Sequence, residues 1–210
     1  MSFNRTRTVA TLAVSLALAA GIAGCRIQTE KGPNGEDKKV QIDTPFGGIH
    51  VNTDQTSAAD LGLPVYPGAT QVMDDDHHKS ADVQMGFGEW QLKVKVVSYQ
   101  TSDSEEKVTA FYKKALGRYG NVITCKDKVP VGTPTTTSEG LGCTDDKSNG
   151  NVKLNTGNYN FKRSELELKA GSKRHQHIVG FENSSNSQTR FALVALDLPA
   201  VVDSDSEKSD

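Results

Sequence analysis

The chain has 210 residues, of which 35% are hydrophobic and 6% aromatic, and its formal net charge is −2. This composition supports the modest core of one domain, and the slight acidic excess argues against general binding of nucleic acid, which requires neutralisation of phosphates. No apolar run reaches the roughly 18–20 residues that a membrane-spanning helix needs.

Residues 1–24 have the pattern of a secretion signal. Arg5 and Arg7 give a positively charged start without any acidic residue, and residues 9–24 are almost entirely small or apolar. A basic start, a short apolar stretch and small residues at its end are the three parts of such a leader. We therefore expect residues 1–24 to be removed on export.

The leader ends in Ile22-Ala23-Gly24-Cys25, which resembles the lipobox of bacterial lipoproteins. In that motif an apolar residue and two small residues precede a cysteine. The resemblance implies cleavage after Gly24, attachment of diacylglycerol to Cys25 and acylation of the new N-terminus. Arg26 follows, where Asp often signals retention in the inner membrane of Gram-negative cells. The resemblance therefore favours the outer membrane, with the protein facing the periplasm.

The remainder of the chain divides into three parts. Residues 25–39 carry the predicted lipid and are otherwise polar, with a Gly-Pro-Asn-Gly run, so we expect a flexible tether. Residues 40–200 contain the periodic apolar patterns and are predicted to form a single α+β domain. Residues 201–210 are mostly acidic and small, and predict a disordered tail.

The first predicted hairpin spans residues 40–53. Apolar residues alternate on both sides of Gly47-Gly48, and a turn at these glycines would pair Phe46 with Ile49 and Thr44 with Val51. Because Pro45 cannot donate a ladder hydrogen bond, we expect this hairpin at the edge of the sheet.

The run Leu-Pro-Val-Tyr-Pro-Gly-Ala at residues 63–69 is followed by a predicted strand, a hairpin and a helix. This order resembles a module of uncharacterised bacterial envelope lipoproteins and covers residues 61–125. The resemblance implies a small α+β fold and no particular activity.

A second hairpin is predicted around Gly88-Glu89. A two-residue turn there pairs Phe87 with Trp90, Met85 with Leu92 and Val83 with Val94, which places every apolar pair on one face.

One long amphipathic helix is predicted from Ser102 to Tyr119. Ser102 and Glu105 fit a capping box, and Gly120 suits the C-terminal end. Helical spacing gathers one apolar stripe, which we expect to pack on the apolar face of the second hairpin. Its members are Val108, Phe111, Tyr112, Ala115, Leu116 and Tyr119.

Further strands are predicted at residues 122–125, 165–170, 174–181 and 190–198. The last is almost continuously apolar, which indicates a central position in the sheet. The predicted fold class is therefore α+β, with a mainly antiparallel sheet and one long helix packed on one face.

Three cysteines are present, and lipid on Cys25 would leave Cys125 and Cys143. Export brings these two into an oxidising compartment, so we predict a disulfide between them. A metal site or a redox pair is less favoured, because the sequence has no CxxC motif and no Cys/His cluster.

Histidines provide weak candidates for metal binding. His175 and His177 lie two apart on a predicted strand and would share a face, but a third ligand must come from elsewhere. His77 and His78 follow three aspartates, in what we interpret as a solvated loop. If residues 171–173 form a turn, Glu167 lies opposite His177, and the histidines are exposed cross-strand partners of polar residues.

Basic residues gather around the same turn, and they offer a weak candidate site for anionic polymers or headgroups. The cluster comprises Lys169, Lys173, Arg174, His175 and His177.

No catalytic motif organises the serines, histidines and acidic residues of the chain. We therefore predict a membrane-anchored lipoprotein of the cell envelope with a binding or structural role, no cofactor, and an envelope protein or polymer as possible partner. Two alternatives stay open: a metal-binding protein or metal-dependent hydrolase that uses His175 and His177, and a binder of anionic polymer through residues 169–177.

Overall fold

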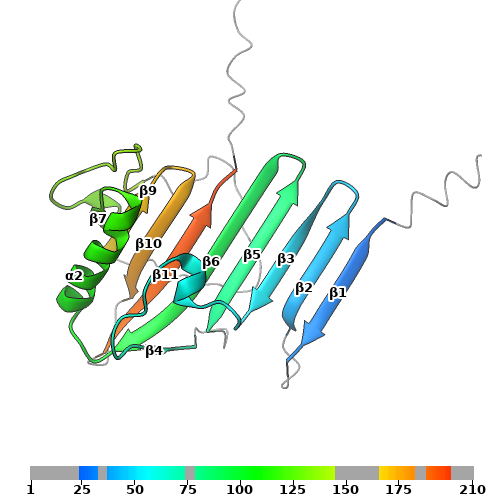
Figure 1. The fold of residues 1–210 in the computed structure, drawn as a ribbon, viewed down its shortest axis with the longest axis horizontal. Helices are drawn as coiled ribbons and strands as arrows, with labels where there is room; N and C mark the ends of the chain where they lie inside the picture. Colours follow the sequence, from blue (N-terminus) through cyan, green and yellow to red (C-terminus); the bar gives the residue numbers. More distant parts are fainter. Residues whose placement is uncertain (1–23, 33–36, 74–78, 145–165, 183–187, 200–210) are drawn as a thin grey trace, which may run out of the picture.

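A computed structural model describes residues 24–32, 37–73, 79–144, 166–182 and 188–199. Its strands form one 11-stranded sheet, in the order β1-β2-β3-β5-β6-β11-β10-β9-β7-β8, with β4 also pairing with β6. Every pairing is antiparallel (Figure 1). The strands are β1 (Arg26–Lys31), β2 (Asp37–Thr44), β3 (Gly47–Thr53), β4 (Thr70–Gln71), β5 (Ser80–Phe87), β6 (Trp90–Thr101), β7 (Ile123–Lys126), β8 (Val129–Pro130), β9 (Leu166–Gly171), β10 (His175–Glu182) and β11 (Thr189–Asp197).

This architecture corrects the predicted α+β class with a long helix. The only α-helix of the described residues is α2 (Glu105–Leu116), which has 12 residues and continues into the 3₁₀ turn η2 (Gly117–Tyr119). Ser104, not Ser102, is its N-cap, and a second 3₁₀ turn, η1, spans Ala58–Leu61. The described residues form mainly one antiparallel sheet, because about half of them pair as strands and the helix is short.

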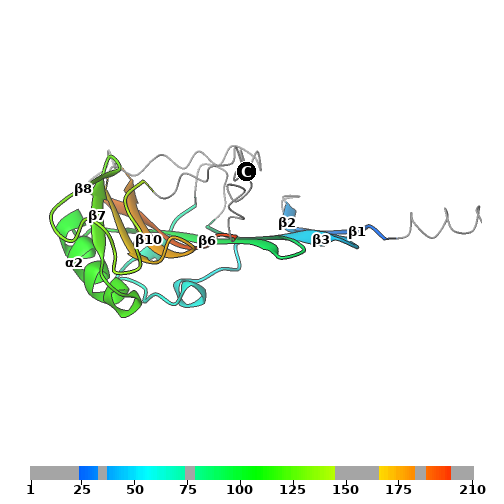
Figure 2. The same cartoon turned by 90° about the horizontal axis from the view of Figure 1, so that it is seen from above.

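The helix covers only one end of the sheet. It packs chiefly against β9 and β10, while β1, β2 and β3 extend beyond it as a flat layer (Figure 2). The predicted helix–hairpin packing is therefore wrong. Val97 and Tyr99 of β6 belong to the core under α2, and side chains alternate along a strand, so Val94 and its hairpin partner Val83 point to the opposite face.

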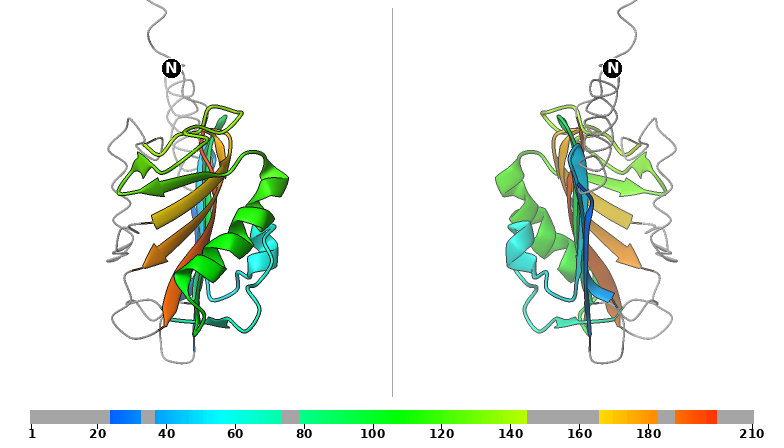
Figure 3. Two further views of the ribbon diagram at one scale, coloured as in Figure 1. Left: turned by 90° about the vertical axis from the view of Figure 1, so that its left-hand side faces the viewer. Right: turned by 90° about the vertical axis from the view of Figure 1, so that its right-hand side faces the viewer.

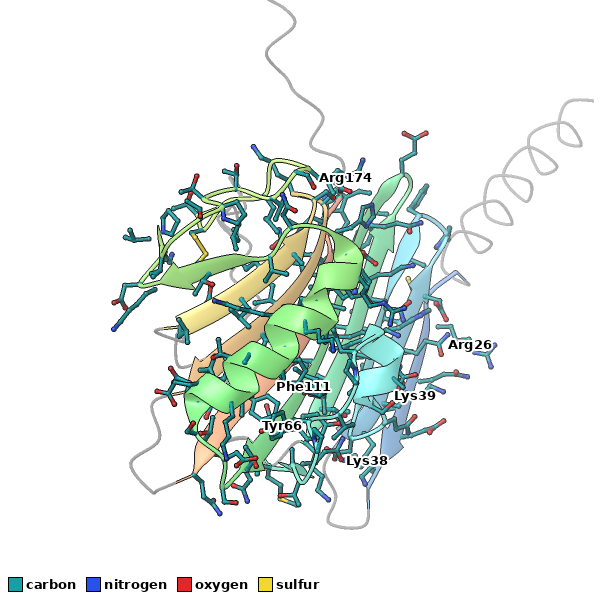
Figure 4. The ribbon with its side chains drawn as sticks, turned by 60° about the vertical axis from the view of Figure 1, so that its left-hand side comes forward. Arg26, Lys38, Lys39, Tyr66, Phe111 and Arg174 are labelled. Carbon is teal, nitrogen blue, oxygen red and sulfur yellow. A yellow bond between two sulfur atoms is a disulfide. The ribbon has the colours of Figure 1, made fainter. Side chains whose placement is uncertain are left out.

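The main core lies between α2, η1 and the C-terminal strands, with the helix on one face of the sheet (Figure 3). Val108, Tyr112 and Leu116 of the predicted apolar stripe are fully buried there. Tyr66, from the segment between η1 and β4, makes a T-shaped, edge-to-face contact with Phe111 of α2 at a ring-centroid distance of 5.1 Å (Figure 4). The stripe is thus confirmed, although its partners are not those expected.

The second hairpin is confirmed pair by pair: Phe87 lies opposite Trp90, Met85 opposite Leu92 and Val83 opposite Val94. The prediction that the last strand is central is also confirmed, because β11 lies between β6 and β10.

The first hairpin differs from the prediction in its strand register and in its position in the sheet. Thr44 pairs with Gly47, so the turn is Pro45-Phe46 and not the two glycines. Proline favours the first central position of a turn because its φ is already fixed, and this decides the register. The hairpin is not at the edge, since β1 flanks β2 and β5 flanks β3.

The edge strand β1 comes from the segment predicted to be a tether. Residues Arg26–Lys31 pair with β2, with Ile27 opposite Ile42 and Thr29 opposite Val40. A flexible tether is therefore wrong for this part of residues 25–39. Local composition suggested a linker, but the neighbouring strand supplies backbone partners that the segment itself does not reveal.

Candidate functional site

Cys25, the predicted lipid attachment site, lies immediately before β1 at the outer edge of the sheet. It is exposed and takes part in no disulfide. Gly24 lies against the turn between β2 and β3, because a Cβ added to it would come within 2.6 Å of Pro45 Cγ. Among the described residues, no helix has the length and apolar character to cross a membrane.

Aromatic side chains surround this corner of the sheet. Phe46 is 83% exposed and Phe87 is 45% exposed, so both aromatic rings are accessible from solution. The rings of Phe87 and Trp90 have centroids 6.1 Å apart. The Gly88 N–H donates to the Phe46 carbonyl oxygen at 3.2 Å, so the two turns adjoin. We call Phe46, Phe87 and Trp90 the aromatic corner.

The predicted disulfide is confirmed: Cys125 of β7 is bonded to Cys143, and their Cα atoms are 5.6 Å apart. Both cysteines are buried and pack with Ile123 in a small second core. Ile123 and Cys125 lie opposite Lys169 and Glu167 of β9, so they share the face that points away from α2. The bond therefore fastens the loop after β7 to that face.

The basic cluster is smaller than predicted. Lys169 is 0% exposed, and its Nζ lies 3.3 Å from Glu167 Oε2, so it is unavailable to a ligand from solution. Lys173, Arg174 and His175 remain exposed, and Arg174 lies at the tip between β9 and β10 (Figure 4). Lys169 is a structural ion-pair partner in this fold, since a buried amine needs a counter-charge.

The turn at this tip is also shifted from its predicted place. Gly171 stays in β9 and pairs with Gln176, with a φ of +102° that glycine tolerates. The Ser172 N–H donates to the His175 carbonyl oxygen at 2.9 Å, so Lys173 and Arg174 form the turn. Ala170, not Glu167, therefore lies opposite His177.

The two histidines of β10 have protein partners. His175 Nδ1 lies 2.9 Å from Asp197 Oδ1 at the surface. The His177 ring stacks on Tyr119 of η2, with centroids 3.5 Å apart and planes 10° from parallel. Burial lowers the pKa of His177 and is the main influence on it. The ring therefore packs as a neutral aromatic group against the end of the helix.

These strands supply no third ligand for the metal site that the sequence suggested at His175 and His177. The described part of the chain holds no group of three His, Cys, Asp or Glu side chains suited to a metal ion. His77 and His78 lie outside the described residues, as does the predicted tail at 201–210.

The structure also reveals a polar network that the sequence did not predict. Tyr66 Oη donates to Asp103 Oδ2 at 2.8 Å, and Lys107 Nζ donates to Asp103 Oδ1 at 2.8 Å. Lys107, followed by Tyr66, holds the pKa of the Asp103 carboxyl below its usual value. Thr189 Oγ1 donates to the Asp103 carbonyl oxygen at 2.7 Å. The i,i+4 spacing of Asp103 and Lys107 in the sequence could have predicted their ion pair, but not the contact of Asp103 with Tyr66.

The segment between η1 and β4 is held by two further tyrosines, Tyr112 of α2 and Tyr119 of η2. Tyr112 Oη donates to the Pro64 carbonyl oxygen at 3.2 Å, and Tyr119 Oη donates to that of Gly62 at 2.8 Å. The proline-rich run at 63–69 thus lies fixed across α2, which gives it a structural role.

Comparisons of the chain with protein-family models, curated proteins and solved structures found no match.

Proposed function

We propose that the protein is a lipoprotein of the bacterial cell envelope, anchored through Cys25, with a binding or structural role and not an enzymatic one. The single observation that carries the proposal is the leader ending in Ile22-Ala23-Gly24-Cys25. A lipid-modified cysteine must be reachable by the modifying enzymes, and Cys25 is exposed and free of disulfide.

The physical consequence is a firm attachment without a spanning helix. Each buried CH₂ of an acyl chain contributes about 0.8 kcal/mol, so one chain binds marginally and two or three hold the protein at the bilayer. Arg26 in the position after the cysteine supports the outer membrane as the destination, with the domain in the periplasm.

The proposal is tested by expressing the full chain in a Gram-negative host and measuring the mass of the mature protein. We expect an N-terminus at Cys25 that carries diacylglycerol and an acyl chain. Cys25→Ala should abolish the lipid and release the protein from membranes. Arg26→Asp is the matched control, because it should keep the lipid while shifting the protein to the inner membrane. An unmodified N-terminus, or a retained leader, would overturn the proposal.

A further inference from the structure

Beyond α2, the described residues form a single-layered sheet whose apolar side chains gather on one face. The registers align Ile27, Ile42, Ile49, Met85 and Leu92 in one row across β1, β2, β3, β5 and β6. A neighbouring row on the same side continues into β11 and contains Val40, Val51, Val83, Val94 and Leu196. We call these two rows the apolar face. It points away from the helix, since Val97 and Tyr99 occupy the other side of β6.

The opposite side of the same strands is polar, and charged side chains there pair with one another. His50 Nε2 lies 2.9 Å from Asp43 Oδ1, and Lys95 Nζ lies 3.6 Å from Asp82 Oδ2. Such side chains favour contact with water. This part of the sheet is therefore amphipathic. On its apolar face Leu92 is buried and Ile27 is exposed, while the other members are half-buried, so a further apolar partner would complete their burial.

The aromatic corner and Cys25 mark one end of this surface. Phe87 follows Met85 by two residues and Trp90 precedes Leu92 by two, so both rings lie on the apolar side. Ile27, two residues after Cys25, is 69% exposed. At about 3.3–3.6 Å per residue, the Ile27 backbone is at most about 7 Å from that of Cys25. Acyl chains on Cys25 would therefore bring β1 to the depth of the headgroups.

We propose that the apolar face, led by the aromatic corner, is a lipid-binding surface that lies against the bilayer at the boundary between headgroups and acyl chains. This inference rests on the proposed lipid anchor at Cys25. Trp and Phe rings favour that boundary, and a partly apolar surface gains free energy when it leaves water there. The polar side of the sheet remains hydrated.

The free edge of β1 is compatible with this depth. Unpaired backbone groups cannot enter the hydrocarbon core, but water and headgroups can satisfy them at the interface. A second copy of the chain is the competing occupant of the apolar face. It is less favoured, because the anchor and the aromatic corner lie at the same end, and lipid on Cys25 places that end at the bilayer.

Trp90 is the only tryptophan of the chain and lies on the apolar side, so its fluorescence reports on this surface directly. The mature lipidated protein is purified from membranes and reconstituted in phosphatidylcholine vesicles, with and without a phosphatidylcholine brominated near the headgroup end of its acyl chains. We expect blue-shifted Trp90 emission that the brominated lipid quenches. In the matched control, Trp90→Phe combined with Gln91→Trp moves the indole to the polar side, and quenching should be lost.

A second pair of variants tests the surface without moving the probe. Met85→Asp places a charge on the apolar face and should reduce quenching of Trp90, whereas Gln84→Asp, one residue away on the polar side, should leave it unchanged. Circular dichroism and the intact disulfide show whether each variant is folded. Quenching that is insensitive to Met85→Asp in a folded variant would overturn the inference.

The mass of the same sample separates the two proposals. If Cys25 carries lipid and the protein floats with the vesicles while Trp90 is not quenched, the lipid-binding surface is overturned and the anchor stands. If Cys25 is unmodified, the anchor fails and this inference fails with it. Unquenched Trp90 in lipidated protein that sediments as a dimer would assign the apolar face to a second copy instead.

Discussion

Replacing both Cys125 and Cys143 by alanine should lower the free energy of unfolding by about 3 kcal/mol. The bond joins residues 18 positions apart. Closing a loop of this length removes conformational entropy from the unfolded chain, which corresponds to about 3 kcal/mol near room temperature. The segment between the cysteines has few buried apolar residues, mainly Leu141. Its packing would therefore compensate for little of the stability that is lost with the disulfide.

The measurement is urea unfolding of residues 25–210, followed by circular dichroism. The comparison uses a Cys25→Ser background, so that no third thiol can exchange with the pair. The double variant should also have a changed denaturant slope, since its unfolded state is less restricted. A loss below about 1 kcal/mol with an unchanged slope would show that loop closure contributes little, and would refute this reasoning.

The other predictions concern the helix, the buried ion pair and the stacked histidine. Leu116→Ala should destabilise by about 2–5 kcal/mol in urea unfolding, because the side chain is fully buried, whereas exposed Lys113→Ala should stay within about 0.5 kcal/mol. Glu167→Gln should cost about 1–3 kcal/mol, because it removes one charged partner of the fully buried amine of Lys169, and an unchanged melting temperature would contradict this. The pKa of His177 is lower in the folded chain than in the unfolded chain, so below about pH 6.5 the unfolded chain binds more protons than the folded chain does. Stability should therefore decrease as the pH falls through that range. His177→Gln should flatten this decrease in unfolding experiments at several pH values, and an equally steep decrease in the variant would refute the assignment.

Short-range patterns identified several elements correctly. Alternation and a two-residue turn fixed the hairpin of β5 and β6, and helical spacing found the buried stripe of α2. The cysteine count, together with the predicted export, identified the pair Cys125 and Cys143. Each of these depends on neighbours in sequence or on simple counting, so composition and spacing were sufficient.

Local patterns were misleading where two turn signals competed. In the first hairpin the Gly-Gly pair suggested a turn, yet Pro45-Phe46 makes it, and the register moves with it. At the tip of β9 and β10, Gly171 remains in the strand and Lys173-Arg174 turns instead. Glycine permits a turn without requiring one, so the pairing of whole strands decided both cases.

The amino-acid sequence by itself determined the amphipathic patterns and the disulfide pair, whereas the leader and the lipobox at Cys25 stay predictions. Only the tertiary structure decided that α2 covers the face opposite the hairpin's apolar side, that Lys169 is buried, and that residues 26–31 form an edge strand. The physical reason is that periodicity tells which side of an element is apolar. Which partner buries that side depends on the order of strands, which is set by contacts between residues far apart in the chain.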